Sequence, residues 1–267
     1  MYLHLPKTGG VSLNRALIEL YFDVFRPHKR RMLQLSAEAS RRTAGLHGLT
    51  DEQVRDVVLH YELVGTRPVR LALGHFRYTA KIIEQLGPAW RTATVLREPT
   101  SRWLSEYYYN RHKTSPHYKT DLDLDAYLES PAGQWGGCCY VRRLVSEAPA
   151  EDSRVTMASM IAEAKQNLER IQILGLLEEL EDFLRRLGDV LGRRLYVGHL
   201  NRNPAPRAAL DRKLDETTLR RIAALCEPDR EIYEHARHLL RVSATGASRD
   251  RDSRHRREIE RTVSSSS

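Results

Sequence analysis

Two short stretches of the chain combine charged, hydroxyl and glycine residues in a way that suits an anion. The first is "PKTGG" at residues 6–10, with Ser12 close behind, and the second is "REPTSR" at residues 97–102. Lysine supplies a point charge, hydroxyls supply donors, and glycines let backbone N–H groups come close to a phosphate or sulfate. Arginine can hold a phosphate by two points. Both stretches are therefore candidate anion-binding segments.

The first stretch lies in a predicted turn between a strand and a helix. Residues 2–5 are apolar and β-favouring, and "SLNRALIEL" at 12–20 has the apolar spacing of a helix with one buried face. A helix start favours an anion through its unpaired N–H groups and its dipole. A tight turn with an exposed lysine is the alternative. The Walker A pattern does not occur, because the lysine precedes the glycines, and this argues against an ordinary ATPase or kinase.

Further strands are predicted where short apolar runs end at glycine, proline or charge. Alternation of these strands with helical patterns predicts one α/β domain with a mostly parallel central sheet flanked by helices. Ligands bind at the carboxyl ends of such strands, where "PKTGG", "GHFRY" (74–78) and "REPTSR" all lie. Residues 26–49 are predicted to be an irregular insertion. The predicted later strands are 69–76, 92–99, 171–176 and 194–200. A helix is predicted to start at Thr50, and further helices are predicted at about 79–86, 99–113, 124–130, 135–146, 155–169, 178–187, 215–225 and 228–241.

Length and composition predict a single globular domain over residues 1–242 and a basic, disordered tail at 243–267. Hydrophobic residues at 41% and charged residues at 29% are ordinary for a soluble protein. The sequence has no run of about 18 apolar residues, so no membrane span is expected. Its three cysteines, two of them adjacent, are predicted to be reduced thiols. With no signal peptide in view, these features predict a cytoplasmic protein.

The charge balance favours anionic partners. Lys and Arg number 43 against 35 Asp and Glu, which gives a net charge of +8. This favours nucleotides, acidic glycans, nucleic acid or a membrane surface without choosing among them. The tail contributes part of the excess, but acidic residues interrupt it and it has no aromatic residues on which bases could stack. Nucleic acid is therefore not an expected partner.

Two of these segments resemble a known enzyme family. "HLPKTGGVSL" (4–13) is similar to the 5′-phosphosulfate loop of sulfotransferases that use 3′-phosphoadenosine 5′-phosphosulfate (PAPS), most of all in the heparan sulfate 2-O and 6-O branch and its bacterial relatives. "TVLREPTSRWLSEYYY" (94–109) resembles the 3′-phosphate motif, and "ILGLLEEL" and "NRNPAP" resemble later landmarks. The resemblance covers roughly residues 2–240. It implies a P-loop-NTPase-like domain that transfers a sulfuryl group from PAPS, its co-substrate, to a hydroxyl or amine without a metal.

The resemblance also implies a role for individual residues. Lys7 is expected near the bridging oxygen of the phosphosulfate, where charge develops as the bond breaks. Arg97 and Ser105 carry over to the 3′-phosphate, and Arg202 is the candidate phosphate ligand of a loop that closes over the nucleotide. The remaining expected ligands of the phosphosulfate are Thr8, Gly9, Gly10, Val11 and Ser12.

His75 is the candidate base. It ends a predicted strand on the ligand side, and a neutral histidine can take a proton near neutral pH. The family's glycosaminoglycan enzymes use a histidine from a comparable stretch; packing is the alternative role. His4, inside the first strand, is predicted to be structural. Glu98 is predicted to orient Arg97, and Arg102 to support its helix.

The acceptor is expected to be a glycan or a small molecule. Loop 113–123 and the basic stretch 26–31 are candidate acceptor-binding segments, and Glu178 is a candidate contact. Basic flanks fit an acidic glycan, or else form an ordinary solvated surface. The sequence lacks the membrane anchor and paired cysteines of a Golgi enzyme, so we expect a bacterial-type cytoplasmic sulfotransferase.

Two other functions remain open at this level. One is a nucleotide-dependent phosphotransferase, which would use ATP and magnesium. The other is a non-catalytic anion- or glycan-binding protein on the same fold. The first would respond to ATP, and the second would have no transfer activity to lose.

Overall fold

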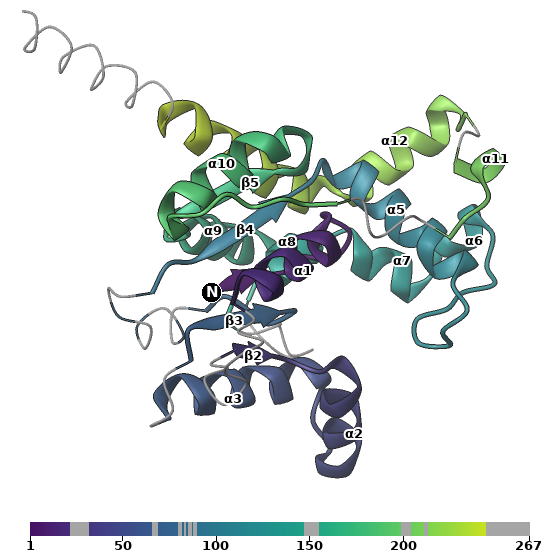
Figure 1. The fold of residues 1–267 in the computed structure, drawn as a ribbon. Coiled ribbons are helices and arrows are strands. Elements are labelled where there is room, and N and C mark those ends of the chain that lie inside the picture. The colour runs from purple at the N-terminus through teal and green to yellow at the C-terminus, as the bar shows by residue number, and fades with distance from the viewer. Residues whose placement is uncertain are drawn as a thin grey trace, which may run out of the picture.

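The computed structural model describes residues 1–21, 32–65, 69–79, 82, 84, 87, 90–146, 155–198, 204–210 and 213–243. In these ranges, five parallel strands form one sheet in the order β2-β3-β1-β4-β5 (Figure 1). The α/β class and the parallel sheet are thus as predicted. The strands are β1 (Tyr2–Leu3), β2 (Met32–Gln34), β3 (Leu71–Gly74), β4 (Ala93–Leu96) and β5 (Ile173–Leu176).

Helices connect and flank the strands. The chain continues from residue 227 to 243 as a helix after a one-residue turn at Cys226. The helices are α1 (Gly10–Tyr21), α2 (Ala37–His47), α3 (Asp51–Val64), α5 (Pro99–His112), α6 (Leu124–Glu129), α7 (Pro131–Gly136), α8 (Cys139–Arg143), α9 (Met157–Glu169), the 3₁₀ turn η2 (Leu177–Glu179), α10 (Leu180–Leu191), α11 (Arg207–Leu210) and α12 (Glu216–Leu225). None of the described helices has both the length and the apolar content needed to cross a membrane.

Side chains alternate between two cores, one on each face of the sheet. Leu71 and Leu73 of β3 pack into the core made with α1 and α10, where Phe183 is fully buried. Ala72, between them, faces the opposite core, which α3, α8, α9 and the helix at 227–243 complete. This period of two is what a sheet covered on both faces requires.

A third cluster lies beside the sheet rather than on it. Trp103 and Tyr107 of α5 pack against Tyr127 of α6 and Ile222 of α12. The Trp103 indole N–H donates to the Gly133 carbonyl at 2.9 Å, which satisfies its buried polar atom. The cluster holds α5, α6, α7 and α12 together as a lobe at the carboxyl end of the sheet (Figure 1).

Residues 26–49 are not an irregular insertion where the structure describes them. β2 pairs with β3, and α2 begins with a Ser36 side chain that accepts from the Ala39 N–H. A strand of three residues is too short for periodicity to reveal, and β2 is specified by its pairing instead. The predicted strand at 194–200 is wrong over 194–198, which form neither strand nor helix.

Two other predicted elements differ in detail. The predicted helix at 135–146 is two helices, α7 and α8, separated near Gly137, where a side chain would collide with the Leu225 carbonyl. The predicted helix at 178–187 begins as η2 before it becomes α10. Most of the predicted helix at 79–86, and residues 244–267 of the tail, lie outside the described residues.

The contact between Gly175 of β5 and the Phe183 ring of α10 yields a stability test. A Cβ at Gly175 would overlap the ring. Gly175→Ala should therefore lower the free energy of unfolding by about 1–3 kcal/mol, measured by urea denaturation. Gly45→Ala, in α2 with open space around it, is the matched control and should raise it by about 0.5–1 kcal/mol. Equal effects at both positions would contradict the packing described here.

Candidate functional site

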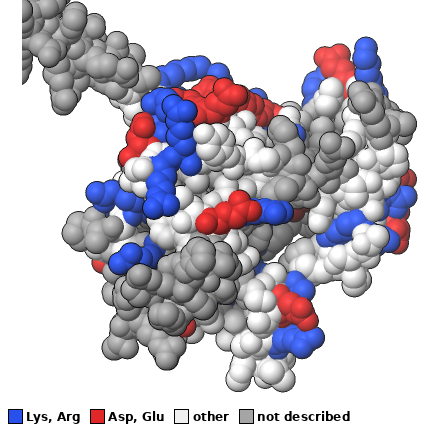
Figure 2. Space-filling model, viewed as in Figure 1, with Lys and Arg blue, Asp and Glu red and all other residues white. Residues whose placement is uncertain are grey.

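The strand order brings the two anion-binding candidates to one place. β1 lies between β3 and β4 in the sheet. The chain runs from β1 to β2 at one edge of the sheet, and from β4 to β5 at the other edge. Ligands of parallel sheets bind in the crevice outside the carboxyl ends at such a switch point. A cleft of about 1930 Å³ opens there. Figure 2 shows the surface hollowed between α2 and the lobe that contains α5, α6 and α7. Of the predicted site residues, it is lined by Lys7, Gly9, Gly10, Val11, Ser12, His75, Arg97 and Ser105.

The two glycines of the first loop serve different purposes. Gly9 has a φ of +78°, a left-handed conformation that glycine adopts freely. At Gly10 a side chain would overlap the His4 ring, so only glycine lets α1 begin against it. Lys7 is also left-handed, with a φ of +64°. Such a backbone costs about 1–2 kcal/mol outside glycine, and strain of this kind clusters at functional sites.

Lys7 is a partly desolvated cation in the cleft. Its Nζ lies 3.7 Å from the centroid of the Tyr109 ring, a cation–π contact. Burial lowers the pKa of Lys7 to about 8; Glu106 opposes this shift, and the Arg97 charge adds to it. The amine therefore stays mostly charged at pH 7 while lacking much of its hydration. An anion placed beside it would be bound strongly.

Thr8 is used differently from the prediction. Its hydroxyl donates to the Leu5 carbonyl at 2.9 Å, and its side chain is buried inside the turn. The hydroxyl is thus committed to the fold of the loop. Thr8 is not among the residues that line the cleft, whereas Ser12 is.

Arg97 joins the second segment to the first. It follows the last residue of β4, and its Nη1 donates to the Lys7 carbonyl at 3.4 Å. Burial lowers the pKa of Arg97 from its usual value without threatening its charge. Ser105 lines the same cleft, two turns into α5. The structure therefore places Lys7, Arg97 and Ser105 around one space.

Glu98 does not act as predicted. Its carboxylate accepts from the Thr100 N–H at 2.9 Å and the Ser101 N–H at 2.7 Å, so it caps α5 instead of bonding to Arg97. Burial alone would raise the pKa of Glu98, but these hydrogen bonds lower it. The Glu98 N–H donates to Glu178 Oε1 at 2.9 Å, which places Glu178 at the cleft.

The other residues of α5 divide between core and cleft. Arg102 is fully buried and donates to Glu106 at 2.7 Å and to the Gly136 carbonyl, so it supports the lobe, as expected. Tyr107 is buried in the third cluster. Tyr108 and Tyr109 line the cleft.

His75 lies at the cleft as a neutral imidazole with a defined orientation. Its Nδ1 lies 2.6 Å from the His4 carbonyl, which can only accept, so the proton belongs on Nδ1 and the lone pair on Nε2. The His4 and His75 rings stack with centroids 4.2 Å apart, and the Asn14 amide donates to His4 Nδ1 at 3.0 Å. Burial, followed by the Arg143 charge, lowers the pKa of His75 to about 4. His75 is therefore unprotonated at neutral pH, and His4 is structural, as expected.

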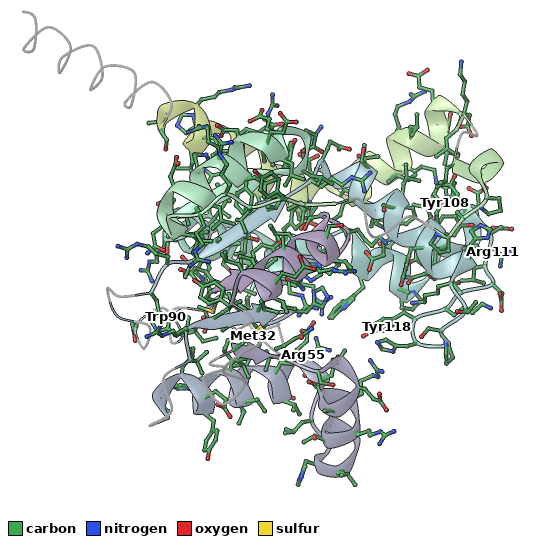
Figure 3. The ribbon with its side chains drawn as sticks, viewed as in Figure 1. Met32, Arg55, Trp90, Tyr108, Arg111 and Tyr118 are labelled. Carbon is green, nitrogen blue, oxygen red and sulfur yellow. The ribbon has the colours of Figure 1, made fainter. Side chains whose placement is uncertain are left out.

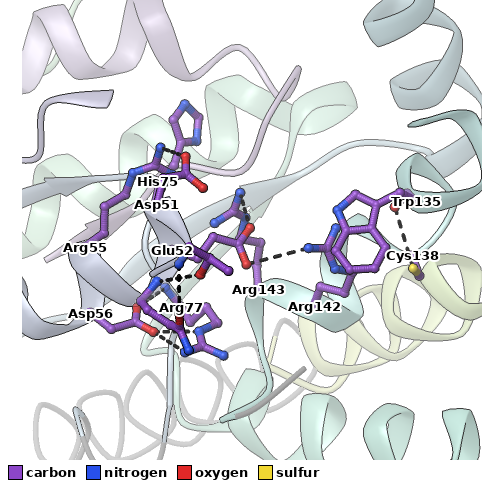
Figure 4. A network of polar contacts seen from close by, with 12 residues as sticks. Asp51, Glu52, Arg55, Asp56, His75, Arg77, Trp135, Cys138, Arg142 and Arg143 are labelled. Carbon is purple, nitrogen blue, oxygen red and sulfur yellow. Dashed lines mark hydrogen bonds and ion pairs between the residues drawn. The ribbon is translucent and has the colours of Figure 1, made fainter. Parts of the chain in front are cut away.

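A basic wall that was not predicted from the sequence stands beside His75 (Figure 4). Arg55 of α3 donates to the His75 carbonyl at 3.2 Å and pairs with Asp51 at 2.5 Å. Arg143 of α8 pairs with Glu52 at 3.1 Å. Within the described residues, the buried Nη1 of Arg143 has no acceptor. Arg142 and Arg143 were not predicted to lie at the site, because two adjacent arginines on a short helix are typical of a solvent-exposed surface.

The same wall extends to an exposed aromatic ring. Arg142 reaches Glu52 at 3.6 Å, so one carboxylate serves two guanidinium groups. The Arg142 guanidinium also stacks 3.0 Å over the centroid of the Trp135 ring (Figure 4). Among the described residues, Arg55, Arg142 and Arg143 form ion pairs with Asp51 and Glu52, so this wall carries more positive than negative groups.

Loop 113–123 forms the opposite side of the cleft mouth. Tyr118 is 67% exposed with a φ of +54°, and Figure 3 shows it across from Arg55. Lys113 donates to Asn110 at 2.7 Å, which ties the loop to α5. The predicted sites at Arg202 and at 26–31 lie outside the described residues.

In comparisons with known proteins, no protein-family model matches the chain, and no curated protein matches it significantly.

The desolvated amine of Lys7 predicts a pH dependence of anion binding. Lys7 is charged below its pKa of about 8 and loses its proton above it. The Kd for inorganic sulfate, which keeps its double negative charge over this range, should be nearly constant in calorimetry from pH 6 to 7.5 and should then rise, by up to roughly tenfold per pH unit, above pH 8.5. Lys7→Arg, which stays charged, should flatten this rise. A wild-type curve that stays flat to pH 9.5 would show that Lys7 does not hold the anion.

Proposed function

We propose that this protein is a PAPS-dependent sulfotransferase on a P-loop-NTPase-like fold. The observation that carries the proposal is the hydrogen bond from Arg97 to the Lys7 carbonyl. It brings the two candidate anion-binding segments, residues 6–10 and 97–102, side by side. A donor with a phosphosulfate and a 3′-phosphate needs two anion sites on one molecule. The strand-loop-helix unit after β1, at the switch point of the sheet, supports the fold assignment.

The proposed donor site uses residues whose chemistry suits two anions. Lys7 and the N–H groups at the start of α1 would hold the phosphosulfate, and Lys7 would stabilise charge on the leaving phosphate. Arg97 would grip the 3′-phosphate by two points, with Ser105 adding a hydroxyl. The donor supplies an activated sulfuryl group, whose bond to the phosphate oxygen breaks as a bond to the acceptor forms.

His75 is the proposed base. Its Nε2 carries the lone pair because Nδ1 is held by the His4 carbonyl. It would take the proton that the acceptor hydroxyl or amine loses as the new bond to sulfur forms. Its pKa of about 4 makes it a weak base, which suits a transfer in which bond breaking leads and proton loss follows.

The acceptor would enter past the basic wall. Arg143 and its neighbours lie beside His75, so an acceptor that carries negative charge would be drawn to that side. The exposed Trp135 ring offers a flat surface for a sugar or another ring. We therefore propose a glycan or small-molecule acceptor. The three described cysteines are free, which supports a cytoplasmic, bacterial-type enzyme.

Nucleotide selectivity separates this proposal from a phosphotransferase. Wild type should bind adenosine 3′,5′-bisphosphate with micromolar Kd in calorimetry without magnesium, and excess Mg–ATP should displace it poorly. Arg97→Ala should weaken binding about 10- to 150-fold, because a charged hydrogen-bonding partner is lost. Arg111→Ala is the matched control on the same helix, where Arg111 pairs with Asp121, and should bind as wild type does. A preference for Mg–ATP would instead support the phosphotransferase.

Transfer assays separate an enzyme from a binding protein. With ³⁵S-labelled PAPS and a panel of polysaccharide, sugar and phenol acceptors, His75→Ala should bind donor normally and transfer about 10²–10⁴ times more slowly. Lys7→Ala should lose about 10²–10³ in rate. His235→Ala is the control, since His235 bonds to Glu169 outside the cleft. Donor binding by wild type without transfer to any acceptor would support the non-catalytic alternative.

A further inference from the structure

Arg97 lies one residue beyond the end of β4, where the hydrogen bonds of the sheet no longer fix the backbone. The β4–β5 ladder ends at the Leu96–Leu176 pair, and the β1–β4 ladder ends at Thr94. Backbone N–H and C=O groups just beyond a ladder must find other partners when they are buried. The position of Arg97 therefore depends on the groups that bond to its backbone N–H and C=O in place of a neighbouring strand.

One tyrosine side chain forms hydrogen bonds with both the N–H and the C=O of Arg97. The Tyr140 hydroxyl donates to the Arg97 carbonyl at 2.7 Å and accepts from the Arg97 N–H at 2.9 Å. The Tyr140 side chain is 0% exposed, so water does not compete for these bonds. A single hydroxyl thus continues the hydrogen-bonding pattern of the sheet by one residue.

Tyr140 is itself held in place. It lies in the first turn of α8, whose N–H groups at Tyr140 and Val141 donate to Asp229 Oδ1 at 2.8 and 3.1 Å. Asp229 is also 0% exposed and belongs to the helix at 227–243. The backbone of Arg97 is thereby fixed to α8 and, through Asp229, to the helix at 227–243. Neither Tyr140 nor Asp229 is in direct contact with Lys7 in the interactions described above.

We propose that Tyr140 is a positioning residue for the donor 3′-phosphate, acting through the backbone of Arg97 and anchored by Asp229. The inference rests on the proposed donor site. A long arginine side chain loses much rotamer freedom on binding, and a fixed Cα reduces the range it must search. The guanidinium is then aimed along the cleft toward Lys7, where the 3.4 Å contact is found.

The test is binding of adenosine 3′,5′-bisphosphate to Tyr140→Phe by calorimetry. This variant keeps the ring and removes both hydrogen bonds, and its Kd should rise about tenfold. Tyr78→Phe is the matched control: Tyr78 is equally buried, and its hydroxyl bonds to Thr92 and to the Arg170 carbonyl away from the cleft. Its Kd should stay within about twofold of wild type.

A double variant distinguishes positioning from general loosening. Added to Arg97→Ala, Tyr140→Phe should weaken binding by less than about twofold, because its effect passes through Arg97. Equal Kd for wild type and Tyr140→Phe, or equal losses in Tyr140→Phe and Tyr78→Phe, would overturn the inference while leaving the proposed function intact. Absence of bisphosphate binding by wild type would overturn both.

Folding of the variant is checked by thermal unfolding. Should Tyr140→Phe fail to fold, Asp229→Asn replaces it, with binding measured at pH 8. Burial raises the pKa of Asp229 to about 7, so the wild-type carboxyl is mostly ionised at pH 8, and the variant keeps an oxygen for the α8 N–H groups but weakens these bonds by removing the charge. The Kd of Asp229→Asn should rise about threefold or more. A value equal to that of wild type would then overturn the inference.

Discussion

The site depends on the packing of one buried imidazole, that of His4. Its ring occupies the space that a side chain at Gly10 would need, and Asn14 of α1 holds its Nδ1. The same ring stacks on His75, and the His4 carbonyl accepts from His75 Nδ1. The start of α1, the end of β1 and the orientation of the candidate base are therefore fixed by one residue. A shift of His4 would move the loop at residues 6–10 and His75 together.

Electrostatics then explain why this cleft would be filled by an anion. Lys7, Arg97 and Arg55 all lose hydration by burial, and their pKa values are lowered for that reason. Asp51 compensates part of this for Arg55. Lys7 has a tyrosine ring as its close neighbour, which is a weak substitute for a counterion. Desolvated cations at a switch point gain most from a ligand with several negative charges, such as a phosphorylated nucleotide.

The sequence allowed prediction of the sheet core and the loops at its carboxyl edge, because apolar runs and glycine pairs are local signals. β2 was not predicted, because three residues are too few to show a periodic pattern. Of the strand expected at 194–200, the described residues 194–198 lie outside the sheet. The hydrogen-bond partners of individual side chains were not predicted either. The Thr8 hydroxyl bonds within its own turn, and Glu98 caps a helix. Tyr140 and Arg143 reach the site from α8, which is distant in the chain, and only the fold brings them there.

The most direct test of the central claim is a crystal structure of the protein with adenosine 3′,5′-bisphosphate. The account predicts that the 5′-phosphate lies on Lys7 and the backbone N–H groups of Gly9 and Gly10, with the 3′-phosphate held by Arg97 and Ser105. It also predicts that Lys7 leaves the Tyr109 ring for the phosphate. A nucleotide bound elsewhere, or bound with its 3′-phosphate away from Arg97, would contradict the account.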